Sequence, residues 1–160
     1  MILKREAMNN LVSEDDLLTW DWVIEQINHS LHYWLSTTRS NGYPHVVPIA
    51  AIWYDDALYF SVSKQSVKGR NISNQPNVAL HLESSTNVFI LEGQTQLAND
   101  DVVQAHITTP YTRRYNFTPP TGQSNQWYKL APQRVLGWLL QDSYHTATRW
   151  VATHKLTGSS

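Results

Sequence analysis

Short segments rich in β-branched and aromatic residues succeed one another through the middle of this 160-residue chain, and turn-forming residues separate them. Segments of this kind form strands. A parallel sheet would need longer helical crossovers between them, so we expect an antiparallel arrangement. The segments are Tyr33 to Thr38, Val46 to Trp53, Ala57 to Val62, Val78 to Glu83 and Val88 to Gln96.

Two of the turns favour hairpins between neighbouring strands. Ser40-Asn41-Gly42 supplies residues that tolerate a positive φ between the first two strands. Asp55-Asp56 suits a tight hairpin between the next two. This part of the chain is therefore predicted to be an antiparallel meander.

Helices and two last strands complete the predicted elements. Ser13 is a suitable N-cap before three acidic residues and an apolar pattern with helical spacing. Pro76 ends a second, short helix, because the residue before a proline disfavours helical geometry. The predicted helices are Glu14 to Asn28, Gln65 to Asn74 and Asp100 to Thr108, the proline-rich segment Thr109 to Gln126 is a loop, and Arg134 to Leu140 and Thr146 to Thr153 are strands.

These elements predict a single domain over residues 1–160, with flexible residues at 1–12 and a tail at 155–160. The fold class is mainly β. The count of short strands and the inserted helices favour a six- to seven-stranded antiparallel β-barrel with short flanking helices.

The composition excludes several classes of function. Twelve Lys and Arg nearly balance 13 Asp and Glu and are scattered along the chain, whereas nucleic-acid-binding surfaces cluster positive charge. Cysteine is absent, no run is as long as a membrane span, and the first residues lack the apolar core of a signal peptide. We expect a cytoplasmic protein without nucleic-acid or membrane partners. The close pair His29 and His32 straddles a helix end without a carboxylate at ligand spacing, so no metal site is predicted.

The segment from Ser61 to Asn71 carries the strongest candidate site. It runs from a strand end into a short helix and contains hydroxyl and amide side chains together with three cations. Backbone N–H groups at a helix start, hydroxyls and a lysine suit a phosphate group, because the dianion needs several donors and a nearby positive charge. A solvated, polar helix start is the alternative interpretation, and no Gly-rich phosphate fingerprint decides between the two.

Six motifs follow one another in the order Trp34-Leu-Ser-Thr-Thr, Gly42-Tyr-Pro-His-Val-Val-Pro48, Leu58-Tyr-Phe-Ser-Val, Ser66-Val-Lys-Gly-Arg-Asn-Ile72, Asn77-Val-Ala-Leu-His81 and Leu91-Glu-Gly93. Val135-Leu-Gly-Trp138 and Thr146-Ala-Thr-Arg-Trp150 come later in the chain. Together they resemble the pyridoxamine 5'-phosphate oxidase-related, FMN-binding split-barrel proteins. The resemblance implies a split β-barrel that binds FMN at the subunit interface of a homodimer.

The resemblance also implies where the cofactor lies. The FMN phosphate is placed against the step from Ser66 to Lys68, and one strand runs along the flavin ring. Trp138 and Arg149 approach the flavin from the partner subunit, as an apolar wall and as a cation that stabilises the anionic reduced flavin. The implied cofactor-binding residues are Val46, Val47, Pro48, Ile49, Ser61, Val62, Ser66, Val67, Lys68, Trp138 and Arg149.

Some positions depart from the family pattern. The oxidases proper commonly have a phosphate-binding Arg at the positions of Val47 and Val67, so Lys64 or Arg70 is a candidate replacement. They also read their substrate with Arg and His residues where this chain has His145 and Ala147. We therefore do not expect oxidation of pyridoxamine phosphate itself.

The resulting hypothesis is an FMN-dependent oxidoreductase that moves a hydride or two electrons between flavin and an unidentified small substrate. A deazaflavin-dependent reductase is one alternative. The other is a binding module that holds flavin or haem without turnover, because no catalytic acid or base is evident. Dimerisation also follows from Trp127 and Trp138, which a barrel in so short a chain leaves with little surface to cover them.

His45 beside the ring is a candidate proton donor or a surface histidine, and Arg113-Arg114 either meets an anionic substrate or is solvated.

Overall fold

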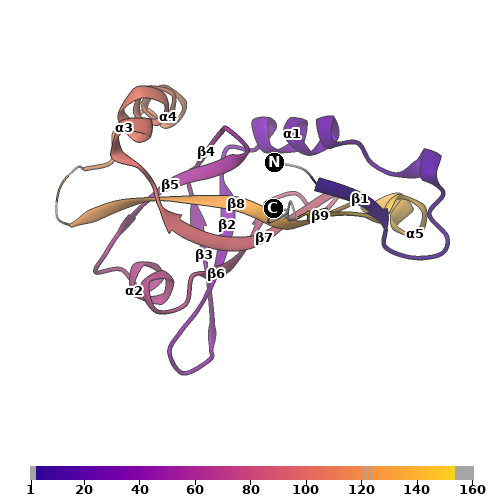
Figure 1. Ribbon diagram of the computed structural model, residues 1–160, viewed down its shortest axis with the longest axis horizontal. Coiled ribbons are helices and arrows are strands. Elements are labelled where there is room, and N and C mark those ends of the chain that lie inside the picture. Colours follow the sequence, from indigo (N-terminus) through magenta and orange to yellow (C-terminus); the bar gives the residue numbers. More distant parts are fainter. Residues whose placement is uncertain (1–2, 121, 123, 154–160) are drawn as a thin grey trace, which may run out of the picture.

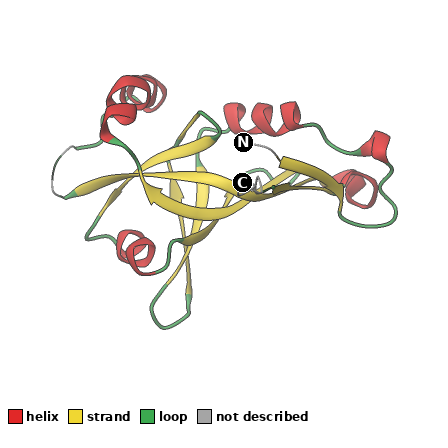
Figure 2. Cartoon of the chain, in the orientation of Figure 1, coloured by secondary structure: helices red, strands yellow, loops and turns green. Residues whose placement is uncertain are grey.

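A computed structural model describes residues 3–120, 122 and 124–153 and shows a strongly curved antiparallel sheet with helices on its outside (Figure 1, Figure 2). The mainly β, antiparallel architecture is thus confirmed. The described residues contain nine strands: β1 Leu3–Ala7, β2 Tyr33–Thr38, β3 Pro44–Ile49, β4 Ile52–Tyr54, β5 Ala57–Ser63, β6 Asn77–Leu82, β7 Asn87–Leu97, β8 Asn125–Leu139 and β9 Thr148–Ala152.

The helices are short. Those of the described residues are η1 Glu14–Asp16, α1 Trp20–His29, α2 Val67–Asn74, α3 Asp100–Val102, the π-helical segment η2 Val103–Ile107, α4 Thr108–Tyr115, η3 Leu140–Asp142 and α5 Ser143–Thr146. None of the helices in this part of the chain is long and apolar enough to cross a membrane.

The strand order is β1-β9-β8-β7-β6-β2-β3. Off this path, β4 pairs with β5, and β5 pairs with β8 along the edge opposite β7. β8 is the longest strand and organises the sheet. One of its edges pairs with β7, while the other pairs first with β5 and then with β9. β8 therefore belongs both to the barrel and to the extension formed by β9 and β1 (Figure 1).

Two expected turns are confirmed. Asp55 and Asp56 both have positive φ, at 45° and 58°, as a two-residue hairpin between β4 and β5 requires. Gly42 also has positive φ, at 85°, in the turn between β2 and β3. These hairpins set the register of the strands on each side of the candidate site.

The first predicted helix begins later than expected. Its N-cap is Thr19, whose hydroxyl accepts a hydrogen bond from the N–H of Trp22, while the acidic residues after Ser13 form only one 3-10 turn. The N–H of Leu18 donates to the Thr148 hydroxyl of β9 over 2.9 Å. This long-range hydrogen bond holds the chain extended before Trp20, so the helix cannot start at Ser13.

The predicted loop from Thr109 to Gln126 is wrong in its first part. Helical structure continues from α3 through the π-helical segment into α4, which ends at Tyr115. Pro110 lies at the start of α4, directly after the π-helical segment, and the helix continues past it. Two strands also differ from the prediction. β1 lies in the segment expected to be flexible, and β8 begins at Asn125 rather than at Arg134.

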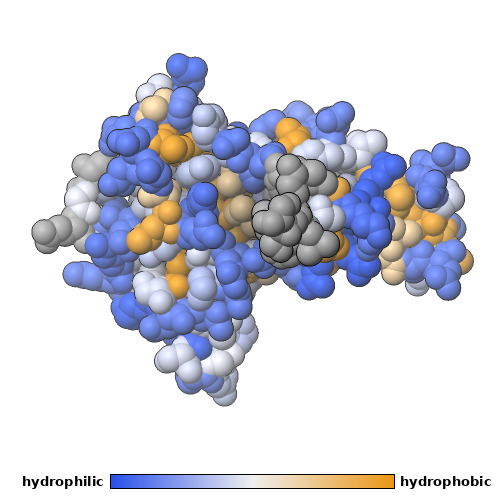
Figure 3. Space-filling view, viewed as in Figure 1, coloured by the Kyte–Doolittle hydropathy of each residue, from blue (hydrophilic) through white to orange (hydrophobic). Residues whose placement is uncertain are grey.

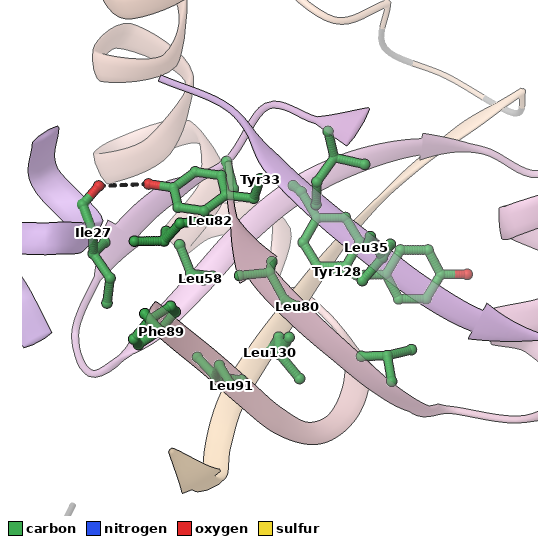
Figure 4. Packing of buried hydrophobic residues seen from close by; sticks show 14 of the residues in the cluster. Ile27, Tyr33, Leu35, Leu58, Leu80, Leu82, Phe89, Leu91, Tyr128 and Leu130 are labelled. Carbon is green, nitrogen blue, oxygen red and sulfur yellow. Dashed lines mark hydrogen bonds between the residues drawn. The ribbon is translucent and has the colours of Figure 1, made fainter. Parts of the chain in front are cut away.

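The main core fills the barrel beneath α1. Figure 4 shows Leu35, Leu80, Leu91 and Leu130 converging there from four strands. Tyr33 lies in the same core and donates a 2.7 Å hydrogen bond from its hydroxyl to the carbonyl of Ile27, which joins α1 to β2. Burial raises the pKa of the Tyr33 hydroxyl.

A second apolar cluster lies outside the barrel, between β4 and β5 and the helical segment from α3 to α4. Its centre contains Tyr59, Ile107 and Tyr111, all buried. The Tyr115 hydroxyl at the end of α4 accepts from the N–H of Ala51 and donates to the carbonyl of the same residue, over 3.1 and 2.9 Å. This contact occurs where the predicted strand from Val46 to Trp53 bends and divides into β3 and β4.

Candidate functional site

The barrel is split between β3 and the end of β5. The β4–β5 ladder pairs Ile52 with Tyr59 and goes no further, although its register would place Ser61 opposite Ala50. β3 pairs along its other edge with β2. The edge of β3 that faces β5 is therefore open, and this opening, from Val46 on β3 to Ser61 on β5, is called the slot.

The backbone groups of β3 point alternately toward β2 and toward the slot, and this alternation determines which groups a ligand in the slot can reach. The N–H of Arg39 donates to the carbonyl of Tyr43, which directs the backbone groups of odd-numbered β3 residues toward β2. The N–H and carbonyl of Val46 and the carbonyl of Pro48 then point to the slot. The side chains of Val47 and Ile49 pack toward the core instead, so only their backbones are available to a ligand.

Ser61 faces the outside of the barrel at the end of β5. Its hydroxyl is buried and has no hydrogen-bond partner, the only hydroxyl of the described residues in that condition. Buried polar groups are usually paired, so an unpaired one needs an explanation. Val62, the next residue, is 1% exposed and points into the core.

Helix α2 follows β5 and places its first turn at one end of the slot. Ser66 is the N-cap: its hydroxyl accepts from the N–H of Gly69 at 3.1 Å and donates to the carbonyl of Ser63 at 2.7 Å. The Ser66 side chain therefore shapes the helix start and has no proton left to donate. The N–H groups of Val67 and Lys68, in the first turn, have no intrahelical acceptor and remain as donors.

Positive charge gathers beside this helix start. His45 lies on the inward-facing side of β3, and its Nδ1 is 3.3 Å from a guanidinium nitrogen of Arg39. Removal from solvent lowers the pKa of His45, and the positive charges of Arg39 and Lys68 lower it further. His45 thus lies at the α2 end of the slot and not along its outer face, which does not favour a proton donor beside a ring. Arg39 was not among the residues singled out from the sequence, because its turn carries no binding motif.

Trp138 and Arg149 lie far from this site in the same chain. Ser61 pairs with Trp127, and Trp138 is eleven residues further along β8, which corresponds to about 35 Å of strand. Figure 1 likewise shows α2 in the left half of the molecule and β9 in the right half. One chain therefore brings together the slot residues and Lys68 but not Trp138 and Arg149.

Arg149 is bound within its own chain. Its guanidinium donates to Glu6 of β1 over 2.7 Å, and Glu6 also accepts from Lys4 over 2.8 Å. These two hydrogen bonds, and the charges of the same groups, lower the pKa of Glu6. Sequence patterns gave no sign of this contact, since no strand was expected at the N-terminus.

The outer face of the sheet carries one continuous row of cross-strand neighbours. The row crosses β3, β2, β6, β7, β8, β9 and β1 in turn, and it is half-buried over most of its length. Its members are Pro48, Trp34, His81, Ile90, Leu136, Arg149 and Glu6. Trp34 and His81 stack with ring centroids 6.5 Å apart.

Hydrophobic surface is present elsewhere too: Leu140 and Tyr144 are exposed at the end of the molecule that carries α5, where Figure 3 shows a hydrophobic patch.

Two other expectations from the sequence are resolved. Trp127 packs edge-on against Tyr111 at 5.2 Å, so α4 covers part of it within the chain. Arg114 donates to the carbonyls of Asn28 and Ser30 and so joins α4 to α1, whereas Arg113 is exposed on α4. Within residues 3–120, 122 and 124–153, no three or more potential metal ligands gather.

The sequence model of the pyridoxamine 5'-phosphate oxidase family matches residues 21–139 of the chain. This chain belongs to that family. The match spans the elements from α1 to β8, and therefore both sides of the slot and the first turn of α2. The search among curated proteins found no match.

Solved structures of low sequence identity share the family fold. A pyridoxamine 5'-phosphate oxidase-related, FMN-binding protein from Nostoc punctiforme is 16% identical, with a TM-score of 0.61 over 87% of this chain and 93% of its own. An F420 reductase is 20% identical, with a TM-score of 0.55 over 69% and 93%. HutZ, the haem storage protein of Vibrio cholerae, is 14% identical, with a TM-score of 0.58 over 69% and 87%. At these identities the similarity shows the fold alone.

Proposed function

We propose that this protein is a homodimeric, FMN-dependent oxidoreductase that transfers two electrons between the flavin and a small organic substrate. One observation carries the proposal: the open edge of β3, the buried and unpaired Ser61 hydroxyl of β5, and the cationic first turn of α2 border the same slot.

The groups in the slot fit the polar parts of FMN. A flavin presents both donors and acceptors along its pyrimidine edge, and Val46 and Pro48 offer one N–H and two carbonyls to such an edge. The Ser61 hydroxyl gains a partner if a polar ring atom lies beside it. The N–H groups of Val67 and Lys68 and the Lys68 ammonium suit the phosphate. When bound, the flavin supplies the redox chemistry, and the protein supplies binding, orientation and charge.

A second copy of the chain completes this site. Trp138 and Arg149 are too distant to reach the slot of their own subunit, but both lie on the outer face of the sheet, beside or within the half-buried row. Pairing of two such faces would bury the row and bring these two residues to the partner's slot. An isologous contact of this kind is the commonest arrangement of homodimers.

The substrate is proposed to differ from pyridoxamine phosphate. His145 occupies a position at which the oxidases proper read their substrate, and here it lies 2.6 Å from Asp142 of its own chain. Ala147 has no polar side chain to offer. The proposal therefore specifies the cofactor more closely than the substrate.

The absorbance of the purified protein tests the cofactor. Bands of oxidised flavin that are released as FMN on denaturation support the proposal. A colourless protein that takes up only a deazaflavin coenzyme contradicts it and favours the reductase alternative, because that coenzyme offers the same slot a similar pyrimidine edge.

Stopped-flow reduction of the bound flavin by nicotinamide nucleotides, followed by reoxidation with candidate acceptors, tests the activity. Reduction of the bound flavin by a donor, or its reoxidation by an acceptor, supports an oxidoreductase. If no physiological donor reduces the bound flavin, the protein is a binding module.

A further inference from the structure

A polar cavity of about 280 Å³ lies between the β2–β3 turn and the side of α2 that faces this turn. The turn contributes Arg39 and Asn41, and the helix contributes Arg70. Asn71 forms part of the wall and is 6% exposed, with its amide nitrogen donating to the Thr37 hydroxyl over 2.9 Å. This buried hydrogen bond therefore fixes the α2 wall of the cavity to strand β2.

The charges around this cavity have one sign. Arg39 and Arg70 are its charged lining residues, and no carboxylate lines it among the described residues. The positive charges of Arg39 and Lys68 both act on His45, so both cations lie near this histidine. The side-chain amides of Asn41, Asn71 and Asn74 add neutral donors. A cavity with these groups suits a compact anion.

The position of the cavity links it to the missing family arginines. Val67, which stands where the oxidases proper have an arginine, also lines the cavity. Lys64, one of the two candidate replacements, lines a different cavity with Asp100 and Trp127. Arg70, the other candidate, faces Arg39 across the cavity beside Val67.

We propose that Arg39 and Arg70 replace the two missing family arginines and hold the cofactor's phosphate from the β2–β3 side of α2, opposite the contact made by Lys68. The inference rests on the proposed FMN-binding function and identifies which residues of this chain recognise the phosphate. Arg39 has a role here that neither the family motifs nor their spacing indicate.

A comparison of FMN with riboflavin tests the inference, because the two differ only in the phosphate. Apo-protein is titrated with each ligand by fluorescence quenching at one ionic strength, for the wild type, Arg39→Gln and Arg70→Gln. We expect each substitution to weaken FMN binding at least about tenfold, equivalent to about 1.4 kcal/mol, and to leave riboflavin binding unchanged. Both side chains are exposed, and their contacts within the chain are the hydrogen bond from Arg70 to the Gln65 carbonyl and the approach of Arg39 to His45, so thermal unfolding should change little.

Two control variants sharpen the result. Arg113→Gln removes the same charge from an exposed position on α4 and should alter neither affinity. Lys64→Gln tests the rival residue. The inference is overturned if FMN affinity falls with Lys64→Gln and not with the two arginine variants, or if FMN and riboflavin affinities change in parallel. If wild-type protein binds neither ligand, the proposed function fails and the inference fails with it.

Discussion

Lys68 is the single residue on which the cofactor proposal can be tested most directly. It lies in the first turn of α2, and its charge reaches His45 on the neighbouring strand. Lys68→Ala should remove a charge-assisted contact with the phosphate worth roughly 1.5–3 kcal/mol, and so weaken FMN binding about tenfold to hundredfold. Fluorescence titration of apo-protein measures the dissociation constant.

Lys129→Ala on β8 is the matched control for Lys68, since it removes the same side chain from another half-buried site. Unfolding of the ligand-free protein should be nearly the same for both variants. Equal FMN affinities for Lys68→Ala and wild type would remove Lys68 from the site.

Gly69 shows how one residue fixes the position of the helix that carries Lys68. A Cβ on Gly69 would collide with the backbone carbonyl oxygen of Ser63, so α2 packs against the end of β5 as closely as glycine alone permits. Gly69→Ala should therefore shift the helix and destabilise the fold by about 1–3 kcal/mol. FMN affinity should fall as well, because the first turn moves with the helix.

Urea unfolding of the ligand-free protein measures the cost of Gly69→Ala. Ser73→Ala, on the exposed side of the same helix, should change stability by less than about 0.5 kcal/mol and serves as the control. Equal stabilities of Gly69→Ala and wild type would show that α2 can move without cost.

At the level of elements, a carboxylate adds to the contacts that hold strand β1. Glu6 joins β1 to Arg149 of β9, and hydrogen bonds from Lys4 and Arg149 lower its pKa below the ordinary value of 4.5. A carboxyl group with a lowered pKa stabilises the folded state above its ordinary pKa and loses that contribution as the pH falls through the folded value. β1 should therefore be held less firmly to β9 in acid, although its backbone ladder with β9 remains.

Tryptophan fluorescence, to which Trp150 opposite Arg5 of β1 contributes, should report this change below about pH 4.5. Glu6→Gln should make the signal independent of pH in that range, whereas Glu14→Gln, an exposed control, should not. If both variants titrate like the wild type, Glu6 does not hold β1.

Most strands and turns from β2 to β7 could be predicted from the sequence because local signals suffice there, although the division of Val46 to Trp53 into β3 and β4 was not predicted. β2 has the predicted bounds, and positive φ occurs at Asp55, Asp56 and Gly42 as their residue types suggest. α2 also lies within its predicted range. Each of these features depends on the pattern of side chains within a few residues.

The remaining elements depend on contacts between distant parts of the chain. The polar residues of β1 form a strand only because β9 offers an edge, and the start of α1 is delayed by the hydrogen bond from Leu18 to Thr148. α4 passes Pro110 because Tyr111 packs into the second apolar cluster. The Arg39 cavity forms only when the β2–β3 turn meets α2. No periodicity or local motif carries such information.

At the scale of the whole molecule, the outer row of the sheet should control dimerisation. Leu136 lies in this row on β8, between Ile90 and Arg149. Leu136→Glu would bury a charge in the proposed interface, so the protein should sediment as a folded monomer at micromolar concentration and lose FMN. Leu11→Glu, at an exposed position outside the row, is the control. A Leu136→Glu dimer with FMN still bound would place the interface elsewhere.

The open edge of β3 has a consequence for solubility. An unpaired strand edge is a template onto which another chain can add a strand, and long edges of this kind lead to aggregation. Pro44 and Pro48 occupy the two positions beside Val46 whose backbone N–H groups would point into the slot, and proline has no such group. Only one N–H therefore remains along these three positions. The edge can still receive a small ligand through its carbonyls, but it cannot continue a sheet.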